Sequence, residues 1–131
     1  NMKLIHFFIL FILLFSCSQQ PTKLSDNREK IVVSYVNWAC NCADFIESKY
    51  YEKKNYEVKD EDCIFIEPAN DSLKIKPEDY EKLSFEKDLI LTGNFYLDKG
   101  VPKSYEPKTE SSTEEARVFR YNKIEFTDKS K

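Results

Sequence analysis

Residues 89–97, LILTGNFYL, form the clearest β-strand pattern in the chain and have a glycine, Gly93, at their centre. Aliphatic and aromatic side chains dominate this run, which is typical of a buried strand. A glycine inside a strand usually marks a β-bulge or a tight bend. Gly93 therefore favours a strongly coiled sheet, such as the wall of a small barrel.

The segments around this strand predict a mostly β domain with one short helix. Residues 45–52 fit either a strand or a short helix, because their apolar residues match both spacings. Pro77 followed by two acidic residues predicts a helix that starts there and ends near Leu83. The other expected elements are strands at 31–38 (IVVSYVNW), 63–67 (CIFIE) and 117–126 (RVFRYNKIEF), with a long polar loop at 101–115.

This order of elements fits an OB-fold, a five-stranded, partly open barrel, here with its helix between the third and fourth strands. About 100 residues follow the first 30, which is enough for one domain with a single core. We therefore predict one OB-like domain over residues 31–126 and a frayed tail at 127–131. Another small β-barrel or a β-sandwich is the alternative.

The first 16 residues have the pattern of a secretory leader. Lys3 is followed by an apolar run over residues 4–15. This run is too short for a membrane-spanning helix of about 20 residues. We therefore expect residues 1–16 to be a signal peptide that is removed from the mature chain.

The next feature is the tetrapeptide LFSC at residues 14–17, which resembles the lipobox of bacterial lipoproteins. Phe15 departs from that pattern, which usually has a smaller residue there. The resemblance implies that Cys17 becomes the first residue and receives the lipid anchor. Residues 17–30 would then form a flexible tether. An ordinary secretory leader with a chance cysteine is the alternative.

Three stretches of the domain, DCIFIEPA, LTGNFYLDKGVP and ARVFRYNKIEF, resemble uncharacterised small lipoproteins of Bacteroidetes with an OB-like domain. The resemblance covers most of residues 31–126 and implies no particular activity. It implies a lipid anchor in the bacterial cell envelope. Because no acidic run follows Cys17, we expect that anchor on the periplasmic side of the outer membrane.

The composition of the domain narrows its chemistry, because the leader contains the only histidine and the only methionine, His6 and Met2. A mature chain without histidine has no Ser-His-Asp or Cys-His arrangement and no histidine-rich metal site. The chain has 20 basic and 23 acidic residues; without Lys3 the difference is 19 − 23, or −4. This balance argues against nucleic-acid binding. We expect no catalytic activity and no cofactor.

Three cysteines, Cys40, Cys42 and Cys63, remain once Cys17 is assigned to lipid. The leading prediction is a disulfide between Cys63 and either Cys40 or Cys42, which would stabilise the fold by about 3 kcal/mol. Alternatively, three thiolates would bind copper or zinc. A Cys40–Cys42 disulfide, closing a small and easily reduced ring, is the third possibility.

Aromatic residues near the end of the first expected strand suggest a ligand site. Trp38 fits a core position, but also a stacking platform beside the loop after that strand, where OB-folds bind ligands. Tyr35 and Tyr96 would join it if they face the same side. Ser72, in the tripeptide DSL, resembles an O-glycosylation acceptor of exported Bacteroidetes proteins, or it belongs to a simple turn.

Together these features predict a lipid-anchored envelope protein that binds a protein, a glycan or another small ligand. The loop at 101–115 and the turn that contains Cys40 and Cys42 would flank the site. The competing prediction is a thiolate metal-binding or redox protein that uses Cys40, Cys42 and Cys63.

Overall fold

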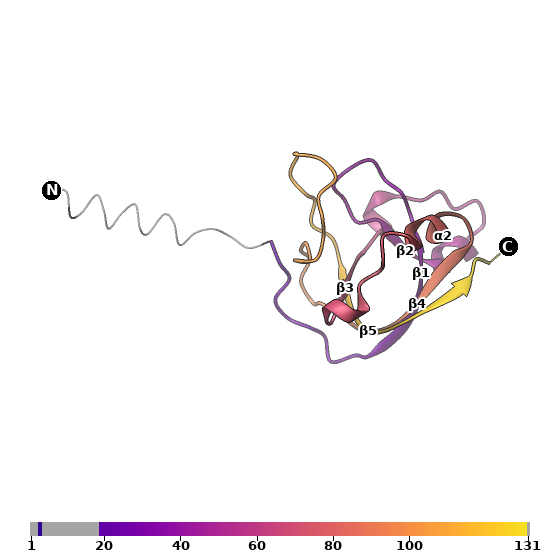
Figure 1. Cartoon of the computed structure of the whole chain (residues 1–131), viewed down its shortest axis with the longest axis horizontal. Coiled ribbons are helices and arrows are strands. Elements are labelled where there is room, and N and C mark those ends of the chain that lie inside the picture. The colour runs from indigo at the N-terminus through magenta and orange to yellow at the C-terminus, as the bar shows by residue number, and fades with distance from the viewer. Residues whose placement is uncertain (1–2, 4–18, 131) are drawn as a thin grey trace.

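The computed structural model describes residue 3 and residues 19–130, and these form a five-stranded sheet curled into a half-barrel (Figure 1). The strands are β1 (Glu29–Tyr35), β2 (Phe45–Glu47), β3 (Phe65–Pro68), β4 (Lys87–Phe95) and β5 (Val118–Asp128). The helix α2 (Asp79–Phe85) lies between β3 and β4, and the connections contain the 3-10 turns η1 (Ser48–Glu52), η2 (Asp60–Asp62) and η3 (Asp71–Leu73). Within the described residues, no helix is long and apolar enough to cross a membrane. The leader apart from Lys3, and the predicted lipidation site, Cys17, lie outside the described residues.

The strand order in the sheet, β2-β1-β4-β5-β3, fits an OB-fold. β1 pairs antiparallel with β2 and β4, β4 pairs antiparallel with β5, and β3 runs parallel to β5. An isolated bridge between Phe45 in β2 and Ile64, just before β3, brings the two edge strands together. The predicted fold class, all-β with one short helix and a small OB-like barrel, is therefore confirmed.

A bulge at Gly93 gives β4 the sharp coiling that the sequence predicts. The β4–β5 register shifts between Thr92, which pairs with Lys123, and Gly93, which pairs with Tyr121. The strands approach so closely that a β-carbon on Gly93 would lie 1.9 Å from the carbonyl oxygen of Arg120. Glycine is needed here because it has no β-carbon.

The four strands predicted at 31–38, 63–67, 89–97 and 117–126 are present, but their ends differ from the predicted ones by one to three residues. Residues 45–52 satisfy both predicted alternatives, because the short strand β2 runs directly into the 3-10 turn η1. The predicted tail at 127–131 is wrong for its first residues. β5 extends to Asp128, and the backbone N–H of Lys129 donates to the carbonyl oxygen of Glu86.

Residues 19–25, the N-terminal strap, lie against the barrel, and β1 begins at Glu29. The described part of the predicted flexible tether (17–30) therefore belongs to the folded domain. The Asp98 carboxylate accepts hydrogen bonds from the backbone N–H groups of Thr22, at 2.9 Å, and Lys23, at 3.2 Å. The polar composition of the segment suggested a solvated linker. Its backbone groups instead find partners 75 and 76 positions away in the sequence.

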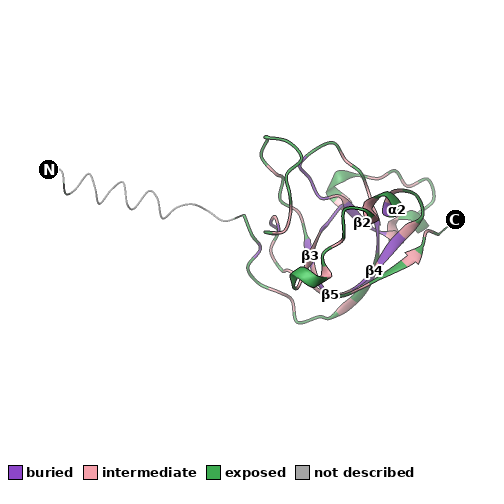
Figure 2. Ribbon diagram, in the orientation of Figure 1, coloured by how far each residue is buried: buried purple, intermediate pink, exposed green. Residues whose placement is uncertain are grey.

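Buried residues lie mainly along the strands (Figure 2). Their side chains form two core groups. The first lies inside the barrel between the strands and α2, which contributes the fully buried Leu83. Along β4, buried positions alternate from Leu89 onward, as expected for a strand with one face on the core. The second group lies beside the β1–β2 connection and consists of Ala43, Ile46, Cys63, Phe65 and Val118.

Candidate functional site

A cavity of about 740 Å³ lies between the β3–α2 connection and the loop that joins β4 to β5. We call it the tyrosine pocket, because four tyrosines from distant parts of the chain line it. They are Tyr35 at the end of β1, Tyr80 in α2, Tyr105 in the β4–β5 loop and Tyr121 in β5. The lining combines aromatic rings with charged and other polar side chains, and a concave site of this kind can bind a small ligand.

Contacts among the lining residues hold two walls of the pocket in place. Tyr35 packs edge-on against Tyr80, with 5.2 Å between the ring centroids. The Tyr121 hydroxyl donates to the carbonyl oxygen of Leu73 at 2.8 Å, which ties β5 to η3. These walls are formed before any ligand binds, and such preorganisation lowers the entropic cost of binding.

Tyr105 contributes a ring and a buried hydroxyl to the wall of the pocket. Its ring packs edge-on against Phe65 at 5.0 Å, and its hydroxyl oxygen is buried close to the backbone of Cys42. Burial, and then the nearby Asp44, raise the pKa of Tyr105, so the hydroxyl stays protonated at neutral pH. The protein encloses this oxygen, so a ligand in the pocket would contact the ring of Tyr105 and not its hydroxyl.

The charged side chains around the pocket balance one another. The acidic ones are Asp44, Asp71 and Glu106, and the basic ones are Lys74, Lys76 and Lys108. Asp44 Oδ2 lies 3.6 Å from Lys108 Nζ. Burial raises the pKa of Asp44 more than Lys108 lowers it. Burial, with a smaller effect from Asp44, also raises the pKa of Tyr80 to about 12.

We expect the Asp44→Asn variant to have a higher free energy of unfolding than the wild type at pH 7, and an unchanged one near pH 3. The folded-state pKa of Asp44 lies above its ordinary value of 3.8, so the folded state holds the proton more tightly. Its stabilising contribution is present below the unfolded pKa and is lost as the pH rises through the folded pKa. Asparagine mimics the protonated carboxyl and removes this dependence.

Urea denaturation of both proteins between pH 3 and pH 8 measures this difference. Asp26→Asn, at an exposed position, is the control and should have little effect. A lower stability of Asp44→Asn at pH 7 would show that the ion pair with Lys108 outweighs the burial of the carboxylate.

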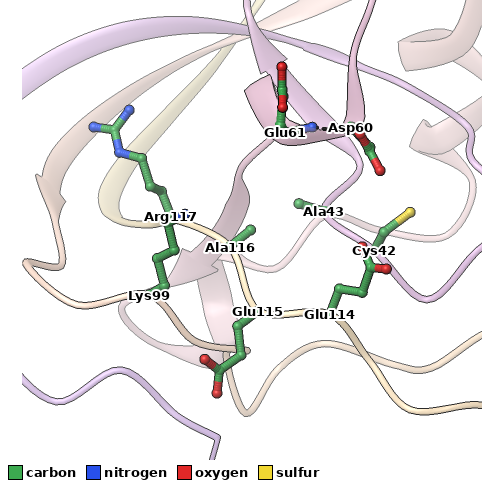
Figure 3. A pocket seen from close by; sticks show the side chains of 9 residues that line it. All are labelled: Cys42, Ala43, Asp60, Glu61, Lys99, Glu114, Glu115, Ala116 and Arg117. Atoms are coloured by element: carbon green, nitrogen blue, oxygen red, sulfur yellow. Dashed lines mark hydrogen bonds between the residues drawn. The ribbon is translucent and has the colours of Figure 1, made fainter.

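A second cavity, of about 380 Å³, lies beside the cysteine-bearing turn (Figure 3). Cys42 and Ala43 line it from the turn, and Ala116 lines it from the end of the β4–β5 loop. Its charged side chains are Asp60, Glu61, Glu114 and Glu115 against Lys99 and Arg117. Among residues 19–130, no cluster of three or more His, Cys, Asp or Glu residues is arranged to hold a metal ion.

The cysteine pairing differs from the leading prediction. Cys40 and Cys42 form the disulfide, and Cys63 is a free, buried cysteine. This pairing is the third of the possibilities that the sequence left open, and it differs from the predicted bond to Cys63. The metal site that would use all three sulfurs stays a prediction. Cys63 packs in the second core group beside Trp38. The spacing of the three cysteines in the sequence did not reveal that Cys63 is a core residue.

The thiol of Cys63 is shielded from reaction. Its Sγ lies 3.5 Å from the carbonyl oxygen of Lys59, to which it donates. Burial raises the pKa of this thiol above its ordinary value of 9.0, although the Trp38 indole opposes part of the rise. The thiolate is the reactive form of cysteine, so a protonated, buried thiol is inert at neutral pH.

In a Cys17→Ser background, we expect alkylation at pH 7 to leave the native protein unmodified. Denaturation without a reductant should expose one thiol, Cys63, and denaturation with a reductant should expose three. Mass spectrometry of the alkylated protein gives these numbers. Two protected cysteines that include Cys63 would contradict the pairing.

Asn41, the residue between the bonded cysteines, is a buried polar residue that nothing in the sequence marks. It is only 4% exposed, and its side chain makes five hydrogen bonds to residues 108–111 in the β4–β5 loop. An asparagine in a short polar turn ordinarily faces solvent or caps its own turn. Only the folded chain shows that its partners are about 70 residues away.

The structure separates the residues that the sequence grouped as a ligand site. Tyr35 lines the tyrosine pocket, whereas Trp38 and Tyr96 pack against the second core group. The Tyr96 hydroxyl donates to Glu67 Oε1 at 2.5 Å, so it already has a partner.

The glycosylation candidate, Ser72, is exposed on the rim of the tyrosine pocket. The Asn70 side chain accepts hydrogen bonds from its backbone N–H, at 3.1 Å, and from its hydroxyl, at 2.5 Å. This is the turn that the sequence offered as the simpler explanation. Modification of Ser72 remains a prediction.

In comparisons with known proteins, the chain matched no protein-family model, no curated protein and no solved structure. The geometry of the tyrosine pocket and of the cysteine-bearing turn is therefore the basis for the function proposed below.

Proposed function

We propose that the protein is a lipid-anchored module of the bacterial cell envelope that binds a ligand in the tyrosine pocket and catalyses no reaction. The leader pattern and LFSC at residues 14–17 support an anchor at Cys17. The acidic composition supports a role that does not involve nucleic acid. The periplasmic side of the outer membrane is the location we assign.

In this anchored form, the N-terminal strap would hold the barrel close to the lipid. Only residue 18 separates Cys17 from the strap, and an extended chain spans about 3.5 Å per residue. The folded domain would therefore begin within roughly 10 Å of the lipid-bearing residue. The domain would lie against the membrane surface, because no long linker would let it move away from the anchor.

A neutral glycan is the ligand that the lining of the pocket favours. Sugar rings have apolar faces that pack on aromatic side chains, and hydroxyl groups that require hydrogen-bond partners. The partly exposed rings of Tyr35, Tyr80 and Tyr105 supply the aromatic surface. Equal numbers of acidic and basic side chains leave no net charge to select an ion. The observation on which this proposal rests is the pair of partly exposed tyrosine rings, Tyr35 and Tyr80, which pack edge-on against each other in the lining of the pocket.

Calorimetric titration of the purified protein with neutral and anionic oligosaccharides tests the proposal. A neutral oligosaccharide should bind with an affinity that changes little with salt, because no charged contact dominates. The Tyr80→Ala variant should bind it at least about tenfold more weakly, which corresponds to about 1.4 kcal/mol.

The control variant is Tyr51→Ala, since Tyr51 is 49% exposed and lies outside the lining of the pocket. It should bind as tightly as the wild type. The proposal fails if no neutral oligosaccharide binds, or if Tyr80→Ala and Tyr51→Ala bind equally well.

A further inference from the structure

We propose that the Cys40–Cys42 disulfide is a redox-controlled clamp on one wall of the tyrosine pocket. The disulfide fixes Asn41, Asn41 holds the β4–β5 loop, and that loop forms the wall. The effect on ligand affinity rests on the proposed function, whereas the effect on the loop does not.

The first step is the hold that Asn41 has on the loop. Asn41 Oδ1 accepts the backbone N–H groups of Lys108, at 2.7 Å, and Thr109, at 3.0 Å. Asn41 Nδ2 donates to the carbonyl oxygens of Thr109, at 3.0 Å, and Ser111, at 2.7 Å, and to Thr109 Oγ1, at 2.9 Å. The backbone N–H of Glu114 also donates to the carbonyl oxygen of Asn41, at 3.1 Å. Asn41 thus bonds to five backbone groups of residues 108–114, namely the N–H groups of Lys108, Thr109 and Glu114 and the carbonyl oxygens of Thr109 and Ser111.

The second step is the dependence of the loop on this hold. The connection from β4 to β5 spans residues 96–117, and no strand or helix forms within it. Irregular connections of this length are usually functional or disordered. The bridge between Gly100 and Ala116 closes the base of the loop. Farther out, at residues 108–114, Asn41 supplies hydrogen-bond partners that regular secondary structure would otherwise supply.

The third step links the loop to the pocket. Tyr105 and Lys108 line the tyrosine pocket and belong to this loop. Lys108 Nζ donates to the carbonyl oxygen of Trp38 at 2.8 Å, so the turn holds the loop at a second point. A loop that loses these contacts no longer presents the ring of Tyr105 at a fixed position.

The fourth step is the role of the disulfide. With only Asn41 between the bonded cysteines, the covalent ring restricts the backbone dihedral angles of that residue, and hence the direction of its side chain. Reduction opens the ring, and the backbone dihedral angles of Asn41 become free to vary. Asn41 must then lose conformational freedom to make the same five hydrogen bonds, so the clamp weakens.

The exchange reaction requires a dithiol reductant, either a dithiol protein or dithiothreitol. Cys40 is exposed and Cys42 is 3% exposed, so a thiolate of the reductant attacks Cys40 Sγ. The Cys40–Cys42 bond breaks, Cys42 leaves as a thiolate that takes up a proton, and a mixed disulfide forms on Cys40. The second thiol of the reductant loses its proton, and its sulfur attacks the mixed disulfide. This releases Cys40, which takes up a proton, and leaves the reductant oxidised.

Hydrogen exchange of the full chain, read by mass spectrometry with and without dithiothreitol, tests the clamp. On reduction, peptides that cover residues 105–114 should exchange at least about tenfold faster, while β4 and β5 remain unchanged. A Cys40→Ser/Cys42→Ser double variant should show the faster exchange and no response to the reductant. Unchanged exchange on reduction would overturn the clamp.

Two further variants test the role of Asn41. Asn41→Ala should show the faster exchange even when oxidised, whereas Ser112→Ala, at an exposed position of the same loop, should match the wild type. If Asn41→Ala leaves the loop protected, the clamp as proposed is wrong.

Saccharide titration of both redox forms separates this inference from the proposed function. Weaker binding by the reduced form supports control of the pocket. Equal affinities, with a loosened loop, would overturn that control while leaving the binding function intact. If neither form binds a saccharide, the proposed function fails. Hydrogen exchange alone then shows whether the disulfide holds the loop.

Discussion

The Gly93→Ala variant is expected to lose at least about 3 kcal/mol of its free energy of unfolding. The added β-carbon would lie 1.9 Å from the carbonyl oxygen of Arg120 and 2.8 Å from the Cα of Tyr121. Both are backbone atoms of the paired strand, so no side chain can rotate away to make room. The β4–β5 pair must separate locally, and this is the central pairing of the barrel.

Urea denaturation followed by circular dichroism measures this loss, and failure of the variant to accumulate as folded protein agrees with it. Thr92→Ala is the matched control, one residue earlier in β4 and partly exposed. Its effect should stay below about 1 kcal/mol, the range of strand propensities. An equally small effect of Gly93→Ala would show that the bulge relaxes and that the close approach is not required.

The second large effect is expected for Tyr121→Ala, at about 3 to 5 kcal/mol, the range for truncating a large buried aromatic side chain. Tyr121 is 1% exposed and belongs to the core group inside the barrel. Its hydroxyl also ties β5 to the β3–α2 connection through the carbonyl oxygen of Leu73. Truncation therefore removes core packing and releases one wall of the tyrosine pocket.

The Tyr121→Phe variant separates these two contributions. It keeps the ring and leaves the Leu73 carbonyl without this donor, so the expected loss is about 1 to 2 kcal/mol. Denaturation of wild type and both variants in parallel measures the difference. A loss for Tyr121→Phe as large as that for Tyr121→Ala would mean that the hydroxyl, and not the ring, stabilises this region.

The main elements of the fold were predictable from local patterns. The run at 89–97 and its central glycine predicted a coiled strand, and the bulge at Gly93 confirms it. The order of elements predicted the OB-like arrangement. These predictions succeed because alternation of apolar residues and the steric demands of glycine are properties of a short stretch of chain.

The cysteine pairing was not predictable in the same way. Spacing shows which loops a disulfide could close, but it does not show which sulfur points into the core. Cys63 lies among Ile46, Phe65 and Val118, and this packing leaves Cys40 and Cys42 to bond with each other. The choice depends on side-chain directions that the whole fold sets.

The candidate site also contains one residue that the sequence predicted and several that it did not. Tyr35 was predicted to lie at a ligand site, and it does line the pocket. Tyr80, Tyr105 and Tyr121 were not singled out, because they come from a helix, a loop and a strand that are far apart in sequence. Trp38 was the more conspicuous residue, yet it packs against the second core group.

By itself, the sequence determined the strands, the coiling at Gly93 and the absence of histidine chemistry from the described domain, since these depend on residue type and local order. The tertiary structure alone decided three things: the position of the N-terminal strap, the assembly of the tyrosine pocket, and the hold of Asn41 on the β4–β5 loop. Each of these depends on contacts between segments tens of residues apart. Such contacts leave no periodic signal in either segment, because each backbone or side-chain partner is chosen by the path of the folded chain.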